Sequence, residues 1–256
     1  MWIGFISLFP EFIELALGLG VLGRAAKNKI IDPHIFNPRD YTSDKHQTAD
    51  DRPYGGGPGM VMMAEPLLKA VEAAKRKSIN DVGDTAHVVY LSPQGERLDQ
   101  RSVEALAKCD SLLLIAGRYE GIDQRVIDSV VDQEVSIGDY VLSGGEIPSM
   151  VLTDAIARLI PGTLGNSEST LVESHLDGLL DYPQYTRPEV IEGEKVPEVL
   201  LSGDHSAIDR WRRGQALWNT WKKRPDLLTA QHWTRSNMEL LEEIFPLDKE
   251  NENAKE

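Results

Sequence analysis

The chain has 256 residues, of which 41% are hydrophobic and 27% charged, and its formal net charge is −14. This length can bury one large core or two smaller ones, and the composition is that of an ordinary soluble globular protein. A single cysteine, Cys109, excludes an internal disulfide framework, and the six scattered histidines show no metal-ligand spacing. We therefore expect a reducing compartment and no structural metal.

The apolar segment at residues 2–9 predicts a buried strand, followed by a helix at 10–17 with Pro10 in its first turn. The segment lacks a basic region, and Pro10 and Glu11 interrupt it. A signal peptide or a transmembrane helix would need a longer uncharged core. We expect a cytoplasmic protein with no membrane contact.

Three glycines near the N-terminus match the dinucleotide fingerprint G-x-G-x-x-G, namely Gly18, Gly20 and Gly23. The fingerprint has meaning only directly after a strand and at the start of a helix. The preceding residues, 12–17, include Glu14, which a buried parallel strand would not readily tolerate. We interpret the glycines as a turn between helices and expect no nicotinamide dinucleotide.

Strand-like and helix-like runs alternate up to about residue 160, which predicts an α/β domain with a mostly parallel sheet covered on both faces. The predicted strands are residues 2–9, 31–36, 87–91, 111–116 and 132–137. The predicted helices are residues 10–17, 20–28, 65–77, 99–108, 121–130 and 146–160.

A long polar loop, residues 37–59, interrupts this alternation and ends in a glycine-rich run at 55–59. No Gly-Lys-Ser/Thr follows the run, so it is not a P-loop and ATP chemistry is not expected. Loops of this length in a compact domain are usually functional or mobile. The run could instead offer its backbone as a platform for a flat substrate.

The pattern changes after residue 162. We predict an α/β domain at 1–162, a flexible linker at 163–176, a small helical domain at 177–246 and a disordered acidic tail at 247–256. Within the helical domain, helices are predicted at 205–224 and 237–244.

The first of these helices carries a run of basic residues, Arg210 to Arg224, interleaved with tryptophans. Such a helix can neutralise phosphates and stack on bases, even in an acidic protein. Alternatively, the helix is solvated and its tryptophans pack into the core.

Three loops follow predicted strands in the middle of the chain, at 92–95, 117–123 and 136–146. In an α/β sheet, ligands bind where such loops expose backbone amides and carbonyls. Three consecutive loops of this kind predict one composite pocket.

The loops Gly117–Asp123 and Ser136–Glu146 resemble those of the bacterial tRNA (guanine-N1)-methyltransferase family, which belongs to the SPOUT class of knotted methyltransferases. So do Asn37–Tyr41, Asp50–Met60 and Tyr185–Glu189, and the resemblance extends from about residue 4 to 228. It implies a SPOUT-like fold, an α/β domain with a mostly parallel sheet and a deep C-terminal trefoil knot, followed by a small α-helical domain. Periodicity alone could not predict the knot, since threaded chains are rare.

The same resemblance implies an activity. The family transfers the methyl group of S-adenosyl-L-methionine to N1 of the guanine directly 3′ of the anticodon, and works as a homodimer with the active site at the subunit interface. The helical domain would then grip the anticodon stem-loop of tRNA, which favours phosphate contacts for the basic helix. A related knotted methyltransferase with another target nucleotide, and a non-catalytic RNA-binding module, remain alternatives.

By motif match, the family's binding residues fall on two sets of positions. The residues assigned to the cofactor are Tyr90, Leu91, Ser92, Pro93, Gly95, Gly117, Glu120, Ser136, Ile137, Gly138, Asp139, Tyr140, Val141, Leu142, Gly144, Gly145 and Pro148. Those assigned to the substrate are Asp50, Pro58 and Gly59. We expect the glycines to let the backbone approach the cofactor closely, where a Cβ would block it.

Neutral guanine N1 carries a proton, so a general base must remove it and a cation should stabilise the charge that appears on O6. The resemblance assigns the cation to Arg158. The family's aspartate base is replaced here by Glu173, and Asp177 is the competing candidate. An unperturbed Glu, with a pKa near 4.3, is a weak base, and one extra methylene moves its carboxylate. The family is also expected to need Mg²⁺, for which Glu120 and Glu173 could supply oxygen ligands.

Overall fold

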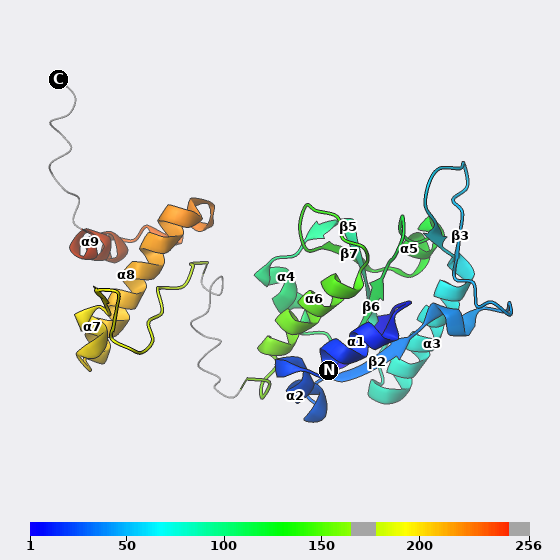
Figure 1. The fold of residues 1–256 in the computed structure, drawn as a ribbon, viewed down its shortest axis with the longest axis horizontal. Coiled ribbons are helices and arrows are strands. Elements are labelled where there is room, and N and C mark those ends of the chain that lie inside the picture. Colours follow the sequence, from blue (N-terminus) through cyan, green and yellow to red (C-terminus); the bar gives the residue numbers. More distant parts are fainter. Residues whose placement is uncertain (165–177, 246–256) are drawn as a thin grey trace, which may run out of the picture. The chain divides into compact units, whose positions relative to one another are not determined.

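The computed structural model describes residues 1–164 and 178–245. The chain divides into two compact units, Met1–Ser167 and Glu168–Glu256, and each is described here by itself (Figure 1). The predicted linker, apart from residues 163 and 164, and the predicted tail lie outside the described residues.

The first unit is built on a parallel sheet, as predicted. Among the described residues this sheet has five strands in the order β2-β1-β6-β5-β7, and every neighbouring pair is parallel. The strands are β1 (Trp2–Ile6), β2 (Asp32–Phe36), β5 (His87–Arg97), β6 (Ser111–Ala116) and β7 (Gln133–Ser136). All residues of β1 and β6 are buried, because the central strands of a parallel sheet are covered on both faces.

Helices on the two faces of the sheet complete two apolar clusters. The helices of this unit are α1 (Pro10–Leu17), α2 (Gly20–Lys27), α3 (Ala64–Val82), α4 (Gln100–Leu106), α5 (Gln124–Val130) and α6 (Glu146–Leu159). One cluster contains buried side chains of α3 and α5. The other contains buried side chains of α1, α2, α4 and α6. The sheet therefore lies between two helical layers, and the loops that follow its strands begin at the carboxyl ends of the strands (Figure 1).

Several predicted boundaries were wrong. Strand β1 ends at Ile6 rather than at residue 9, and α3 continues to Val82 rather than ending at 77. Strand β5 does not end at residue 91 but continues to Arg97, and its register against β7 shifts between Leu91 and Glu96. The predicted loop at 92–95 is therefore a bulge within a strand. Helix α5 begins at Gln124 rather than at 121, because Asp123 caps it by accepting a hydrogen bond from the Arg125 amide.

The long polar loop contains short elements. A 3₁₀ helix, η1 (Pro38–Tyr41), is followed by β3 (Asp50–Asp51), which pairs antiparallel with β4 (Val61–Met62). Strand β4 is joined to the loop that follows β6, since the Met62 amide donates to the Gly121 carbonyl at 3.0 Å. The glycine-rich run is thus held close to the central loops.

The dinucleotide-like glycines form a turn between two helices, as predicted. Gly18 caps the C-terminus of α1, and Gly20, with φ of 58°, begins α2. A Cβ on Gly23 would lie 2.7 Å from the carbonyl carbon of Gly18. These glycines serve the close packing of two helices.

The second unit is mainly helical. It contains a hairpin of β8 (Val190–Ile191) and β9 (Glu194–Lys195), α7 (Glu198–Leu201), α8 (His205–Lys223), two 3₁₀ helices, η3 (Pro225–Leu227) and η4 (Ala230–His232), and α9 (Arg235–Ile244). The two predicted helices correspond to α8 and α9. Their small core holds Leu179, Ala216, Leu217 and Leu240. The hairpin escaped prediction because its strands are two residues long and exposed. Within residues 1–164 and 178–245, no helix is long and apolar enough to span a bilayer.

Candidate functional site

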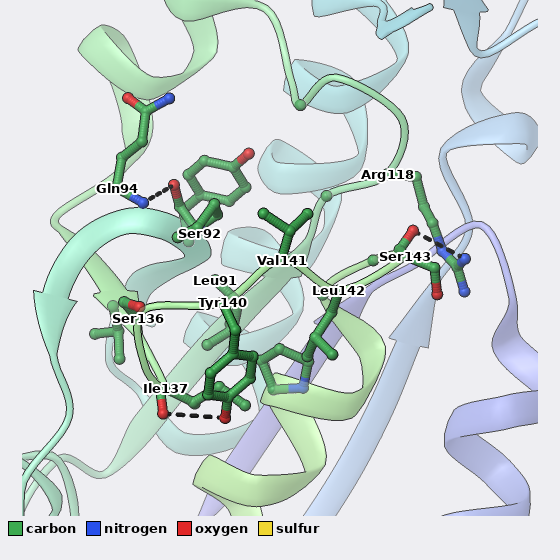
Figure 2. Close-up of a pocket in the computed structure, with 18 of the residues that line it drawn as sticks. Leu91, Ser92, Gln94, Arg118, Ser136, Ile137, Tyr140, Val141, Leu142 and Ser143 are labelled. Atoms are coloured by element: carbon green, nitrogen blue, oxygen red, sulfur yellow. Dashed lines mark hydrogen bonds between the residues drawn. The ribbon is translucent and has the colours of Figure 1, made fainter. Parts of the chain in front are cut away.

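A cavity of about 250 Å³ lies at the carboxyl ends of β5, β6 and β7, where the three central loops meet (Figure 2). All the residues predicted to bind the cofactor line it, except Gly95 and Asp139. It is also lined by residues that were not singled out, namely Gln94, Arg118, Tyr119, Gly121, Val135 and Ser143. Each of these residues is next to a predicted residue in the sequence. Only their position in or beside the three loops could have indicated that they line the cavity.

The glycines of this cavity are required by the protein chain itself. A Cβ on Gly117 would lie 2.9 Å from the ring and hydroxyl of Tyr90. A Cβ on Gly145 would lie 2.6 Å from the Cα of Ala116, and one on Gly144 would collide with Arg118. We expected these glycines to admit a ligand. That expectation stays a prediction, and the observed contacts show that these glycines also let neighbouring segments of the cavity wall pack against each other.

Gly95 has a similar function at the bulge in β5. A Cβ on Gly95 would collide with the backbone of Glu134 and Val135 on the neighbouring strand. Beside it, the amide of Gln94 donates to the Ser92 hydroxyl at 3.1 Å. Gly95 thus holds the bulge against β7, and Ser92 and Gln94 line the cavity.

The loop after β7 closes into a tight turn around Gly138, whose φ is 149°. The Ser136 hydroxyl contacts both the amide and the carbonyl of Gly138, at 3.2 and 3.1 Å. The Tyr140 hydroxyl donates to the carbonyl of Ile137 at 3.3 Å (Figure 2). Val141 then projects outward with 86% of its surface exposed. Asp139 is exposed and does not line the cavity.

Tyr90 is 5% exposed and stands behind Gly117. Burial raises the pKa of its phenol, and this outweighs the opposing effect of a hydrogen bond with the backbone of Ile122. Tyr90 is thus a neutral aromatic side chain in the cavity wall, and its hydroxyl is hydrogen-bonded to the loop that follows β6.

Two of the predicted substrate residues lie beside the cavity. Burial and the carboxylate of Asp50, which accepts a hydrogen bond from the phenol, raise the pKa of Tyr119. A Cβ on Gly59 would lie 2.6 Å from the Cγ of Glu120, and the Glu120 amide donates to the carbonyl of Met60 at 3.0 Å. The glycine-rich run is therefore brought against Glu120, and Asp50 against Tyr119. Pro58, the third predicted residue, is exposed next to Gly59.

The candidate catalytic residues are only partly visible. Arg158 is half-buried in the last turn of α6, while Glu173 and Asp177 lie outside the described residues. Among the described residues, one group of side chains could hold a metal ion, namely Asp32, His34 and Asp81, and it does not include Glu120. A Mg²⁺ requirement stays a prediction.

The basic residues of α8 and its C-cap residue, Arg224, differ in their surroundings. Arg210 pairs with Glu243, Arg212 with Asp209 at 3.4 Å and Arg224 with Asp226 at 2.6 Å. These partners reduce the positive charge that the helix offers to a ligand. Lys222 lies over the ring of Trp218, at 5.8 Å, and Lys223 is exposed at the end of the helix.

Of the tryptophans of α8, one packs against another aromatic side chain and one is exposed. Trp218 stacks on Phe245 with ring centroids 4.3 Å apart, which is a packing contact. Trp221 remains exposed beside it. A cationic and aromatic surface is thus concentrated at the C-terminal end of the helix.

The chain was compared with known proteins. Residues 1–230 match the family model of tRNA (guanine-1)-methyltransferase TrmD. Three curated proteins named tRNA (guanine-N(1)-)-methyltransferase are close in sequence. The one from Psychromonas ingrahamii is 55% identical over 94% of this chain and 97% of its own length. Those from Pseudoalteromonas translucida and Cronobacter sakazakii are 57% and 55% identical, over 89% and 95% of this chain and 88% and 93% of their own lengths.

Proposed function

The chain belongs to the tRNA (guanine-N1)-methyltransferase family, and on this premise we propose that it transfers a methyl group from S-adenosyl-L-methionine to N1 of the guanine directly 3′ of the anticodon. It is a methyltransferase that acts on guanine N1 of tRNA. One observation carries the assignment, namely identity of about 55% with enzymes of this name along almost the whole chain. We expect the reaction in the cytoplasm, where the tRNA substrate is found.

The cavity suits S-adenosyl-L-methionine. Its lining combines apolar side chains, such as Leu91, Ile137 and Leu142, with three serines and the backbone groups of the glycine loops. Apolar walls with few polar groups are typical of small-molecule sites, although about 250 Å³ lies just below their usual range of roughly 300–1,000 Å³. When bound, this cofactor supplies an electrophilic methyl group.

We also propose that the loops at 117–121 and 136–145 form part of the deep trefoil knot typical of the family. Two contacts support this. The Gly145 amide donates to the Gly117 carbonyl at 2.8 Å, and Arg118 pairs with Gly144 in an antiparallel bridge. These contacts join two segments of the cavity wall that are distant in sequence.

The chain's own groups must move a proton and stabilise a charge. Glu173 is our first candidate for accepting the N1 proton of guanine, and Asp177 is the second. Arg158 would hold its guanidinium near O6, where negative charge develops as the proton leaves. Asp50, placed beside Tyr119, and Gly59, placed beside Glu120, would position the guanine.

A homodimer with the active site at the subunit interface fits the surface of the first unit. Helices α1 and α6 adjoin each other (Figure 1). Both carry exposed apolar side chains, Phe12 and Leu15 on α1 and Ile147 and Val151 on α6. Grouped apolar side chains on a soluble protein commonly mark an interaction surface. Sedimentation of the wild type and of Ile147→Glu tests the proposal: a dimer that the substitution dissociates supports it, and a monomeric wild type contradicts it.

Methylation of tRNA transcripts tests the activity itself. Transcripts carrying guanine or adenine at the position 3′ of the anticodon should be incubated with S-adenosyl-L-methionine, and the modified nucleoside identified by mass spectrometry. We expect 1-methylguanosine from the guanine transcript alone. Transfer to the adenine transcript but not to the guanine one would favour a knotted enzyme with another target. Tight tRNA binding without cofactor binding would favour a non-catalytic module.

A further inference from the structure

A buried carboxylate lies directly behind the wall of the cofactor cavity. Glu146, the first residue of α6, is 2% exposed. One of its oxygens accepts a hydrogen bond from the Ser7 hydroxyl at 2.8 Å, and the other lies 2.9 Å from Nε of Arg118 in an ion pair that lacks hydrogen-bond geometry. A buried carboxylate is stable only when it is paired and hydrogen-bonded, and the N-terminus of α6 adds favourable electrostatics.

These three residues come from separate parts of the fold. Ser7 follows β1, Arg118 follows β6, and Glu146 follows the Gly144–Gly145 turn. Ser7 is itself fixed, since its hydroxyl accepts from the amide of Phe9 at 3.0 Å. The network of Ser7, Arg118 and Glu146 thus joins the ends of two strands to the start of α6.

Arg118 carries the network to the cavity. Its guanidinium lies 4.3 Å above the ring of Phe9 and donates to the carbonyl of Ser143 at 3.2 Å (Figure 2). Both Arg118 and Ser143 line the cavity, and so does Gly144, whose missing Cβ leaves room for the guanidinium. Arg118 thus connects the buried carboxylate of Glu146 to the cavity wall.

We propose that Ser7, Arg118 and Glu146 are positioning residues that hold the Ser143–Gly145 segment in the conformation that binds the methyl donor. A buried ion pair contributes little net stability compared with apolar side chains of similar size, so its effect should appear in the geometry of the wall. Holding a binding loop in its bound conformation increases affinity by removing the cost of ordering it. This inference rests on the proposed function, because it takes S-adenosyl-L-methionine as the ligand.

The test uses the chain of 256 residues, two variants of the network and one control variant. Arg118→Met/Glu146→Leu replaces both charges with apolar groups and leaves no unpaired buried charge. Ser7→Ala removes one hydrogen bond and keeps the ion pair. Arg235→Met/Glu239→Leu makes the same exchange at an exposed ion pair of α9 and serves as the control. Thermal unfolding, calorimetry with S-adenosyl-L-methionine and hydrogen exchange of the Gly145 amide are measured for each.

We expect the Arg118→Met/Glu146→Leu variant to unfold near the wild-type temperature but to bind S-adenosyl-L-methionine at least about tenfold more weakly. Ser7→Ala should weaken binding roughly two- to tenfold, the equivalent of one hydrogen bond. Both should exchange the Gly145 amide faster without ligand, while the control changes neither quantity.

Wild-type affinity and wild-type exchange in both variants would overturn the proposal. Should the double variant fail to fold, Ser7→Ala with unchanged exchange would overturn it alone. A wild type that does not bind the methyl donor would instead contradict the proposed function, and the exchange measurement would still decide whether the network holds the segment.

Discussion

The amide of Gly145 donates a hydrogen bond of 2.8 Å to the carbonyl of Gly117. This bond ties the loop after β6 to the turn that precedes α6, and both residues line the cavity. The Cβ position of Gly145 is occupied by the backbone of Ala116. The two loops can therefore meet only if residue 145 has no side chain.

Gly145→Ala should consequently separate the two loops. A Cβ placed 2.6 Å from the Cα of Ala116 forces the backbone to move, since no side chain can rotate away. We expect S-adenosyl-L-methionine binding to weaken by more than about tenfold, together with a lower unfolding temperature. Gly18→Ala is the matched control, because its Cβ would meet only ordinary contacts at 3.4 Å or more. Normal cofactor affinity in Gly145→Ala would contradict the packing argument.

Tyr90 should stay protonated above the pH at which ordinary tyrosines ionise. Burial raises its pKa from the ordinary 10.0, so the folded protein holds this proton more tightly than the unfolded chain. That contribution to stability is complete below pH 10 and is lost as the pH rises through the folded-state pKa. Up to about pH 10, we expect equal phenolate absorbance from the wild type and Tyr90→Phe. Above it, the wild type should lose stability more steeply, and an extra phenolate in the wild type at pH 10 would contradict the prediction.

Arg158→Ala should reduce kcat and leave cofactor affinity unchanged. The charge on O6 develops only on the way to the transition state, so a cation that stabilises it contributes to kcat rather than to ground-state binding. Loss of one such group typically costs about 100- to 1,000-fold in rate. Single-turnover kinetics measure the rate, and calorimetry measures the affinity. A variant that binds the cofactor poorly but turns over normally when saturated would assign Arg158 to binding.

Glu173→Gln and Asp177→Asn should identify the general base. Replacing the carboxylate that takes the N1 proton with an amide should lower kcat by about 100- to 10,000-fold, because the amide cannot accept the proton. We expect the larger loss at Glu173. Near-normal turnover of Glu173→Gln with a large loss in Asp177→Asn would transfer the role to Asp177.

Lys223→Ala should make tRNA binding less sensitive to salt. Each phosphate contact releases about one counterion, so the slope of log K against log salt should become less steep by about one. Lys108→Ala removes an exposed lysine from the first unit and is the control. Equal slopes for both variants and the wild type would mean that the end of α8 does not contact the phosphates.

The sequence by itself determined the parallel sheet, its helices and most of the residues of the cavity. Apolar runs such as Val88–Tyr90 and Leu112–Ile115 have a clear strand pattern, and the loops that follow are long enough to be recognised against a known family. Loop assignment needs only order along the chain, because the carboxyl ends of parallel strands meet at one edge of the sheet.

The tertiary structure alone decided why particular residues stand in those loops. Gly145 faces the backbone of Ala116, Gly95 faces a neighbouring strand, and Glu146 is paired with Arg118 and Ser7. Ser7 and Glu146 lie 139 positions apart in the sequence, so no local pattern links them. Close packing and the pairing of a buried charge depend on distances in space, and these exist only once the chain has folded.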